Sequence, residues 1–348
     1  MENFWENTTC MPHNDPAKID RLLQTVCEKR EIDLIAFSLK MISSQPALCQ
    51  ETGFFEGFNI LKSASAERRR ELIKHPLFVA WFKQTVRAQN EPKRLAEKLT
   101  EFGRVWETTA RDDEALLTVE GQRVLIRRYE VDPLIMEAAF PEYQLPDRDR
   151  RNEIAREVIY PERLFAEMLA IALERIKHSW PEAYRNFPRF VKIVVDMIDG
   201  EYTSYSSAEH TGAIFVSTDN SPLVALEEFL IHEFGHQILY YLMEVDPLIT
   251  EGDETIYRLP WSGNERDLYG YFHAFYIYIL MARYLERVKH RSKREQKRIK
   301  ARRSHILKGL KQTVEAFEKN ENFTDCGRVL FNNLKSEVEQ IEENIRNK

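Results

Sequence analysis

The sequence has few cysteines, no uninterrupted apolar run of membrane-spanning length and no excess of positive charge. Its four cysteines are scattered and form no Cys-x-x-Cys pair, which argues against a disulfide framework or a cysteine-type zinc site and fits a reducing, cytoplasmic setting. The first fifteen residues lack the basic start and apolar core of a signal peptide. The two most apolar windows, 223–243 and 269–285, fall short of a clean span of about 20 apolar residues, so no membrane association is expected.

What remains is the composition of an ordinary globular protein. The chain has 348 residues, 43% of them hydrophobic, which is enough for one large domain or two modest ones with a real core. Its 12 glycines and 14 prolines argue against low complexity. The net charge of −6 gives no overall attraction to nucleic acid, so nucleic acid is not expected as a partner.

Two regions are expected, residues 1–145, mostly helical, and residues 146–348, with a soft boundary near residue 145 among Pro133, Pro141 and Pro146. In the first region, apolar spacing predicts helices from residue 16, over 66–89 with a break near Pro76, and over 91–102, then a strand over 124–126. In the second region we predict a helix over 161–178, strands over 191–198 and 213–216, a long apolar helix over 223–243, a loop over 251–264, an apolar helix over 266–287 and charged helix from there to residue 348. The expected fold class is α+β and mostly helical, with a small sheet.

The long apolar helix contains the motif His232-Glu233-Phe-Gly-His236. An α-helix turns once every ~3.6 residues, so residues four apart lie on one face and both imidazoles can point at one ion. Glu233 lies on an adjacent edge, within reach of a water bound to that ion. The motif predicts a zincin-like metal helix that binds a divalent transition metal.

The same motif can be two ordinary helix histidines, but its surroundings argue against that interpretation. The neighbouring residues are mostly apolar, and leaving a polar group unpaired there costs about 1–3 kcal/mol. One metal ion would be a partner for both imidazoles. Gly235 inside the helix costs about 1 kcal/mol relative to alanine, which predicts that some group approaches the backbone closely at this point.

A metal site needs a third ligand, and the sequence offers three candidates. His273 lies in the second apolar helix, where it could instead be a core histidine. Glu265 would match a metallopeptidase with a downstream glutamate ligand, although Ser262 and Glu265 also have the spacing of a capping box that starts the helix. His210 is expected in a loop.

The position of Arg266, seven residues before His273, favours His273. On one helix the two residues would share a face two turns apart, with Gly270 between them, and a pocket would separate the metal ligand from the guanidinium. A dicarboxylate could fill this pocket, with one end on the metal and the other held by Arg266. The alternative for Arg266 is an ion pair with Glu265 or Asp267.

The pattern Tyr257-x-x-Pro260-Trp261 … Arg266-x-x-x-Gly270-x-x-His273, after His232-Glu233-x-x-His236, resembles a family. It is similar to the bacterial HExxH-motif peptide-modification proteins, some of which are iron(II)/2-oxoglutarate-dependent peptide β-hydroxylases of ribosomal-peptide (RiPP) biosynthesis. The serine-rich run 204–217 is also similar to that family. The resemblance covers about residues 190–290, and its Trp-x-x-x-x-Arg-x-x-x-Gly-x-x-His part is the more specific.

The resemblance implies that His232, His236 and His273 bind iron(II), and that Arg266 binds the distal carboxylate of 2-oxoglutarate. In one departure from the family, Asp267 follows Arg266 where members tend to have proline. The implied activity is a dioxygenase that hydroxylates a side chain of a substrate peptide.

The implied ligand set is neutral, whereas non-haem iron oxygenases generally use two histidines and one carboxylate. Glu233 or Glu265 could supply that carboxylate. Aromatic residues could form the apolar walls of the substrate site: Tyr257 and Trp261, and also Phe272 and Tyr276, for which core packing is the better interpretation.

Two other classes of function fit the same residues. A zinc(II) metallopeptidase would use Glu233 as the general base on a zinc-bound water, with Glu265 or His273 as the third ligand. A non-catalytic, metal-bound peptide-binding protein would bind without turnover.

The last feature is a basic run. Residues 287–303 contain ten Lys and Arg and a single acid, Glu295. This run is either a solvated helix or a patch for an acidic leader segment of a substrate peptide, or for another polyanion.

Overall fold

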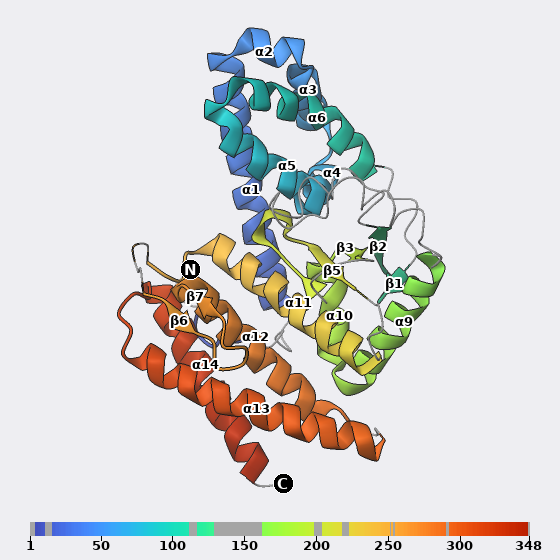
Figure 1. Ribbon diagram of the computed structural model, residues 1–348. Helices are drawn as coiled ribbons and strands as arrows, with labels where there is room; N and C mark the ends of the chain where they lie inside the picture. Colours follow the sequence, from blue (N-terminus) through green and yellow to red (C-terminus); the bar gives the residue numbers. More distant parts are fainter. Residues whose placement is uncertain are drawn as a thin grey trace. The chain divides into compact units, whose positions relative to one another are not determined.

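The computed structural model describes residues 4–10, 16–110, 117–128, 162–197, 204–217, 223–250, 252, 255–289 and 292–346 (Figure 1). These residues form mostly helices, a small mixed sheet and a two-stranded hairpin, which confirms the expected α+β, mostly helical class. The predicted boundary near residue 145, with Pro133, Pro141 and Pro146, lies outside the described residues. No described helix is both long enough and apolar enough to cross a membrane.

The chain folds into two compact units, each assembled from separate stretches. One unit comprises Met1–Leu22, Ala170–Phe187 and Pro222–Lys348, and we call it the histidine unit because it contains His232, His236 and His273. The other comprises Leu23–Leu169 and Pro188–Ser221, and we call it the sheet unit. Three helices run through the junctions between these stretches: α1(Pro16–Ser44), α9(Glu162–Ser179) and α10(Pro181–Phe190).

The helices of the sheet unit pack around one aromatic core. After α1 they are α2(Pro46–Glu51), α3(Phe54–Ser63), α4(Ala66–Lys74), α5(Pro76–Arg87), the 3-10 turn η1(Ala88–Asn90) and α6(Pro92–Ala110). Phe54, Trp81 and Phe102 meet at the centre, with 4.8 Å between the ring centroids of Trp81 and Phe102. The predicted break near Pro76 is confirmed, because proline cannot donate a backbone hydrogen bond inside a helix and here it opens α5.

The sheet has the order β1-β2-β3-β5-β4 and is built from β1(Leu117–Val119), β2(Gln122–Arg128), β3(Ile193–Asp196), β4(Ser204–Tyr205) and β5(Ala213–Val216). Strands β2, β3 and β5 run parallel, and the edge strands β1 and β4 are antiparallel to their neighbours. Every residue of β3 and β5 is buried, as expected for central strands with β-branched sequences. Strands β2, β3 and β5 confirm the three strands that the sequence predicts.

The histidine unit is a helical bundle built around α12(Leu268–Arg287), which packs against α11(Leu223–Val245), α13(Lys293–Glu318) and α14(Asp325–Arg346) (Figure 1). Helix α12 is apolar on nearly all sides and largely buried, as a central helix must be. The N-terminal segment also belongs to this unit: the indole Nε1 of Trp5 donates to Asp246 at 3.0 Å, and Asn333 Nδ2 donates to the carbonyl of Trp5 at 3.0 Å.

The stretch before α12 differs from the prediction. Its described part contains a small antiparallel hairpin, β6(Tyr257–Arg258) with β7(Glu265–Arg266), where a loop was expected. The alternative interpretation of Ser262 and Glu265 as a capping box is wrong, because α12 begins later: Asp267 is its N-cap, and the Asp267 carboxylate accepts the N–H of Gly270 at 2.8 Å.

Candidate metal centre

Helix α11 places His232 and His236 on one face, with 5.0 Å between the centroids of their rings. Helix α12 lies alongside and brings His273 to the same place, with its ring centroid 5.7 Å from that of His236 and an angle of 33° between the planes. The three imidazoles thus form a consecutive row across two packed helices. Of the candidates for a third ligand, His273 is the one that the structure places against the motif.

Gly235 is the reason that the two helices can approach so closely. A Cβ atom at this position would lie 2.8 Å from Leu280 Cδ2 and 2.9 Å from Ile277 Cδ1, well inside van der Waals contact. The predicted close approach is therefore confirmed, and the approaching groups are side chains of α12. Because Gly235 directly precedes His236, the same contact sets the separation between His236 and His273.

All three imidazoles are held in the neutral form. Burial, followed by the nearby guanidinium of Arg302, lowers the pKa of His232 to about 4, although 32% of its side chain stays exposed. Burial also lowers the pKa of His273 to about 3, and burial together with its two histidine neighbours holds the pKa of His236 well below its usual range. Their lone pairs are therefore available at neutral pH, which is the form that binds a metal.

The donor set fits a transition metal, although the side chains as they stand do not surround one point. Imidazole nitrogen suits zinc, copper and iron(II). The Nδ1 atom of His236 is buried and has no hydrogen-bond partner among the described residues, as expected for an atom reserved for a ligand. Within the described part of the chain, no three His, Cys, Asp or Glu side chains are already arranged to hold a metal ion.

The row of histidines is walled by residues that the sequence did not single out. The ring of Tyr269 lies tilted against His273 with 4.2 Å between centroids, and the ring centroid of Tyr240 lies 5.5 Å from that of His273 and 5.9 Å from that of His236. The Sδ atom of Met243 lies 3.3 Å from His273 Nε2. Tyr240 and Met243 follow His236 by four and seven residues, so helical periodicity alone would have placed them on this face.

Glu233 lies at the same site, in the interior. Only 2% of its side chain is exposed, and its Oε1 lies 4.0 Å from Nε2 of His232. A carboxylate at this position can orient an imidazole, or rotate toward a metal-bound water. The geometry leaves both roles of Glu233, base and carboxylate ligand, as predictions.

Arg266 and Glu265 are both exposed, and both belong to β7 rather than to α12. The argument that Arg266 shares a helix face with His273 is therefore wrong, because the helix starts two residues after Arg266. The Arg266 side chain lies against Gly270, whose added Cβ would be 3.0 Å from Arg266 Cδ, and its Nη1 donates to the carbonyl of Glu265 at 2.8 Å. The Asp267 carboxylate caps α12 instead of pairing with the guanidinium of Arg266.

Trp261 reaches the histidine row through one intermediate ring. It stacks on Tyr278 with 4.1 Å between centroids, and Tyr278 lies 6.3 Å from His232. Its Nε1 donates to the carbonyl of Ile306 at 3.1 Å, so α13 anchors the indole. Tyr257 stacks on Tyr271 with 5.0 Å between centroids and accepts a hydrogen bond from Asn320, and its role in substrate binding stays a prediction.

Three other residues considered as site candidates lie in the protein interior. Phe272 and Tyr276 are fully buried, in agreement with the core interpretation. His210 closes the 3-10 turn η4(Ala208–His210) of the sheet unit, where it is buried and its ring lies 5.1 Å from that of Phe215. The sequence places His210 in a loop, and it does lie in the connection between β4 and β5, where an aromatic neighbour covers it.

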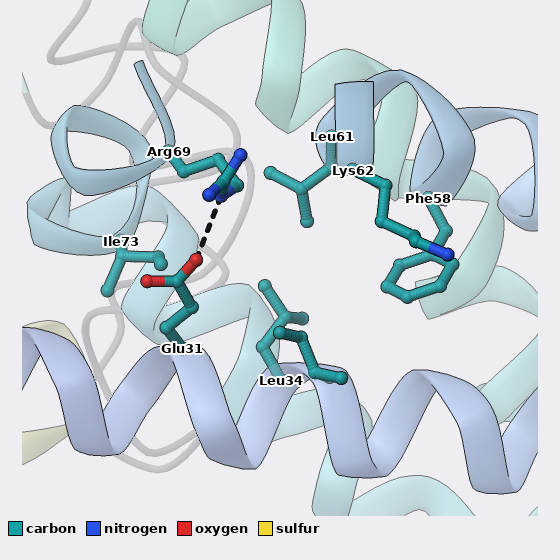
Figure 2. A pocket seen from close by; sticks show the side chains of 8 residues that line it. Glu31, Leu34, Phe58, Leu61, Lys62, Arg69 and Ile73 are labelled. Atoms are coloured by element: carbon teal, nitrogen blue, oxygen red, sulfur yellow. Dashed lines mark hydrogen bonds and ion pairs between the residues drawn. The ribbon is translucent and has the colours of Figure 1, made fainter. Parts of the chain in front are cut away.

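The sheet unit contains a separate cavity of about 130 Å³, shown in Figure 2. Its walls are mostly apolar, and the ion pair between Arg69 Nε and Glu31 Oε1, 2.8 Å long, lies at one side (Figure 2). The lining residues are Glu31, Leu34, Ile35, Phe58, Leu61, Lys62, Arg69 and Ile73. None of the predicted site residues lines it.

Comparison with known proteins adds no relative: no protein-family model and no curated protein sequence matches this chain. The resemblance to the HExxH-motif family therefore rests on the residues of 190–290 themselves.

Proposed function

We propose that this chain is an iron(II)- and 2-oxoglutarate-dependent hydroxylase that modifies a side chain of a ribosomally made peptide, with α11 as a zincin-like metal helix. The observation that carries the proposal is the row of His232, His236 and His273 on two helices pressed together at Gly235. Three neutral nitrogen donors from two rigid elements are a suitable ligand set for a catalytic metal that keeps open positions.

The protein's part in this chemistry is positioning and exclusion of water. His232, His236 and His273 would hold the iron, with Glu233 as a second-sphere carboxylate or a fourth donor. Tyr269 and Tyr240 cover the side of His273 and keep it dry. When bound, the metal and cosubstrate supply the oxidising power: dioxygen and 2-oxoglutarate are consumed, one oxygen atom enters a C–H bond of the peptide as hydroxyl, the other enters succinate, and carbon dioxide leaves.

Arg266 is proposed to bind the distal carboxylate of 2-oxoglutarate. Its guanidinium is exposed, and its single bond to a neutral backbone carbonyl is weaker than a bidentate ion pair with a carboxylate. Because Asp267 is engaged at the helix cap, the guanidinium is not neutralised by its neighbour. Changing Arg266 to Ala should weaken binding of 2-oxoglutarate about tenfold to a hundredfold, from a charge-assisted bond of about 1.5–3 kcal/mol. Arg258→Ala, in the paired strand β6, is the matched control.

The experiment is aerobic incubation with iron(II), 2-oxoglutarate and candidate peptides, reading succinate formation and the gain of one oxygen by mass. His273→Gln should abolish both signals and reduce the iron bound per chain. His178→Ala, which changes an exposed histidine of α9, should leave both unchanged. Full succinate formation by the His273→Gln protein would overturn the assignment.

The rival function is a zinc metallopeptidase, and the buried position of Glu233 beside His232 is the observation that favours it. Glu233 would then take a proton from a zinc-bound water while His273 or Glu265 completes the ligand set. Glu233→Gln should abolish peptide cleavage but only reduce hydroxylation. A protein that binds metal and peptide but turns over neither substrate would instead be a peptide-binding protein.

A further inference from the structure

The first half of α13 carries a basic surface, which we define as Lys293, Arg294, Lys297, Arg298 and Lys300. All five side chains are exposed, and none pairs with an acid in the described part of the chain. Helical spacing places the three lysines along one line of the helix and the two arginines along the next, with buried Ile299 on the opposite side. The positive charges therefore point together into solvent.

The one acid in this stretch does not neutralise the surface. The Glu295 carboxylate accepts hydrogen bonds from the backbone and hydroxyl of Ser292, closing a capping box at the start of α13. It also accepts from Arg175 Nη2 at 3.2 Å. Its charge is thus directed toward the helix start and α9, away from the lysines.

The negative charge of the rest of the chain favours a short anionic partner over a long one. Residues 287–303 contribute ten positive and one negative charge, so with a total of −6 the remaining residues carry −15. A long polyanion such as a nucleic acid would be attracted locally and repelled by its surroundings. A short acidic segment meets only the basic surface.

The basic surface continues toward the candidate metal centre. Arg302, less than one turn after Lys300, pairs with Glu228 Oε2 of α11 at 3.4 Å and lies over the ring of Tyr278 at 5.7 Å. Tyr278 in turn lies 6.3 Å from His232. A chain bound along α13 would therefore lead to the histidine row at its Arg302 end.

We infer that the basic surface of α13 binds a short acidic stretch of the substrate peptide, next to the residue that is modified. From Lys293 to Lys300 the helix rises about 10 Å, at about 1.5 Å per residue. An extended peptide covers that length with about three to four residues, at about 3.3 Å each. The preferred partner is thus a peptide with three or four consecutive Asp or Glu residues. Its role as substrate rests on the proposed function, whereas its binding does not.

The test measures fluorescence anisotropy of a labelled peptide with four consecutive Glu, against the same peptide with Gln. The whole protein should bind the Glu peptide, and binding should weaken as salt rises from about 10 mM to about 150 mM. Changing Lys293, Lys297 and Lys300 together to Gln should weaken binding about tenfold, from three exposed charge pairs. The matched control changes Lys93, Arg94 and Arg104 of α6 to Gln, an equal loss of charge on another helix, and should have no effect.

Three outcomes overturn the inference: equal binding of the Gln peptide, an equal loss in the α6 variant, or tighter binding of a single-stranded DNA of the same charge. None of these three binding measurements requires a bound metal or enzymatic turnover. If the Glu peptide binds through α13 but no oxygen is gained with iron and 2-oxoglutarate, the docking surface stands and the proposed function fails. If oxygen is gained equally by the α13 variant on an acidic peptide, the proposed function stands and the docking surface fails.

Discussion

Replacing His236 with Leu should make the metal-free protein more stable. The buried Nδ1 of His236 has no hydrogen-bond partner among the described residues, and a buried unsatisfied polar group costs about 1–3 kcal/mol. Leucine removes that cost but also removes the ring contacts with His232 and His273, worth roughly 0.5–1.5 kcal/mol. The free energy of unfolding should therefore rise by about 1 kcal/mol, because a ligand residue is kept for binding and not for stability.

The assay is urea unfolding followed by circular dichroism, first with a chelator and then with zinc(II) at about a hundred times its dissociation constant. Zinc should stabilise the unmodified protein by about 2.7 kcal/mol and His236→Leu by nothing. The control is His75→Leu. The Nδ1 of His75 accepts the N–H of Leu77 at 3.3 Å and caps α5, so this change should destabilise by about 1 kcal/mol.

The opposite pattern would refute the reasoning. If His236→Leu lost stability in the chelator and zinc still stabilised it, His236 would be a core histidine. The row of imidazoles would then be packing, and both enzymatic proposals would lose their metal.

Three further predictions concern single positions. Gly309→Ala would place a Cβ inside the indole of Trp261, so it should lower the free energy of unfolding by about 1–3 kcal/mol and change the tryptophan fluorescence. Its control, Gly103→Ala, meets nothing within 4 Å and should raise the free energy of unfolding by up to about 1 kcal/mol. Burial lowers the pKa of Lys192 to about 8 from its usual 10.5, so the unfolded chain binds more protons between these values and the stability of the protein should rise with pH from 8 to 10.5. Urea unfolding of Lys192→Met should lack that rise and show a gain of up to about 3 kcal/mol at pH 7; an unchanged pH slope would contradict the assignment. Asp267→Ala should cost about 1 kcal/mol in thermal unfolding by loss of the α12 cap, and Asp267→Asn, which can still cap, should cost little.

Local sequence signals predicted the elements well where one period or one breaker dominates. The break at Pro76, the strand 213–216 and helix α11 follow from such signals. The hairpin of β6 and β7 has two residues per strand, too few for any period, and was missed. That omission also put Arg266 on the wrong element.

Local spacing also predicted part of the candidate site, and tertiary packing determined the rest. The spacing of His232 and His236 fixes them on one helix face regardless of tertiary structure. The spacing from Arg266 and the family resemblance singled out His273, but its position beside His236 depends on how α11 packs against α12, for which the sequence signal was Gly235. The contact of Tyr269 with His273 and the path from Trp261 through Tyr278 depend on tertiary contacts that no local pattern encodes.

The order in which the chain visits its two units limits how the protein can be dissected. Neither unit is a continuous stretch, so cutting near residue 145 would remove the segment 1–22 from the histidine unit. That segment supplies Trp5, whose indole and carbonyl bond to Asp246 and Asn333. A fragment that begins after the predicted boundary would keep all three imidazoles and still lack part of the bundle that holds them, so the loss of metal binding by such a fragment would report on folding and not on ligand identity.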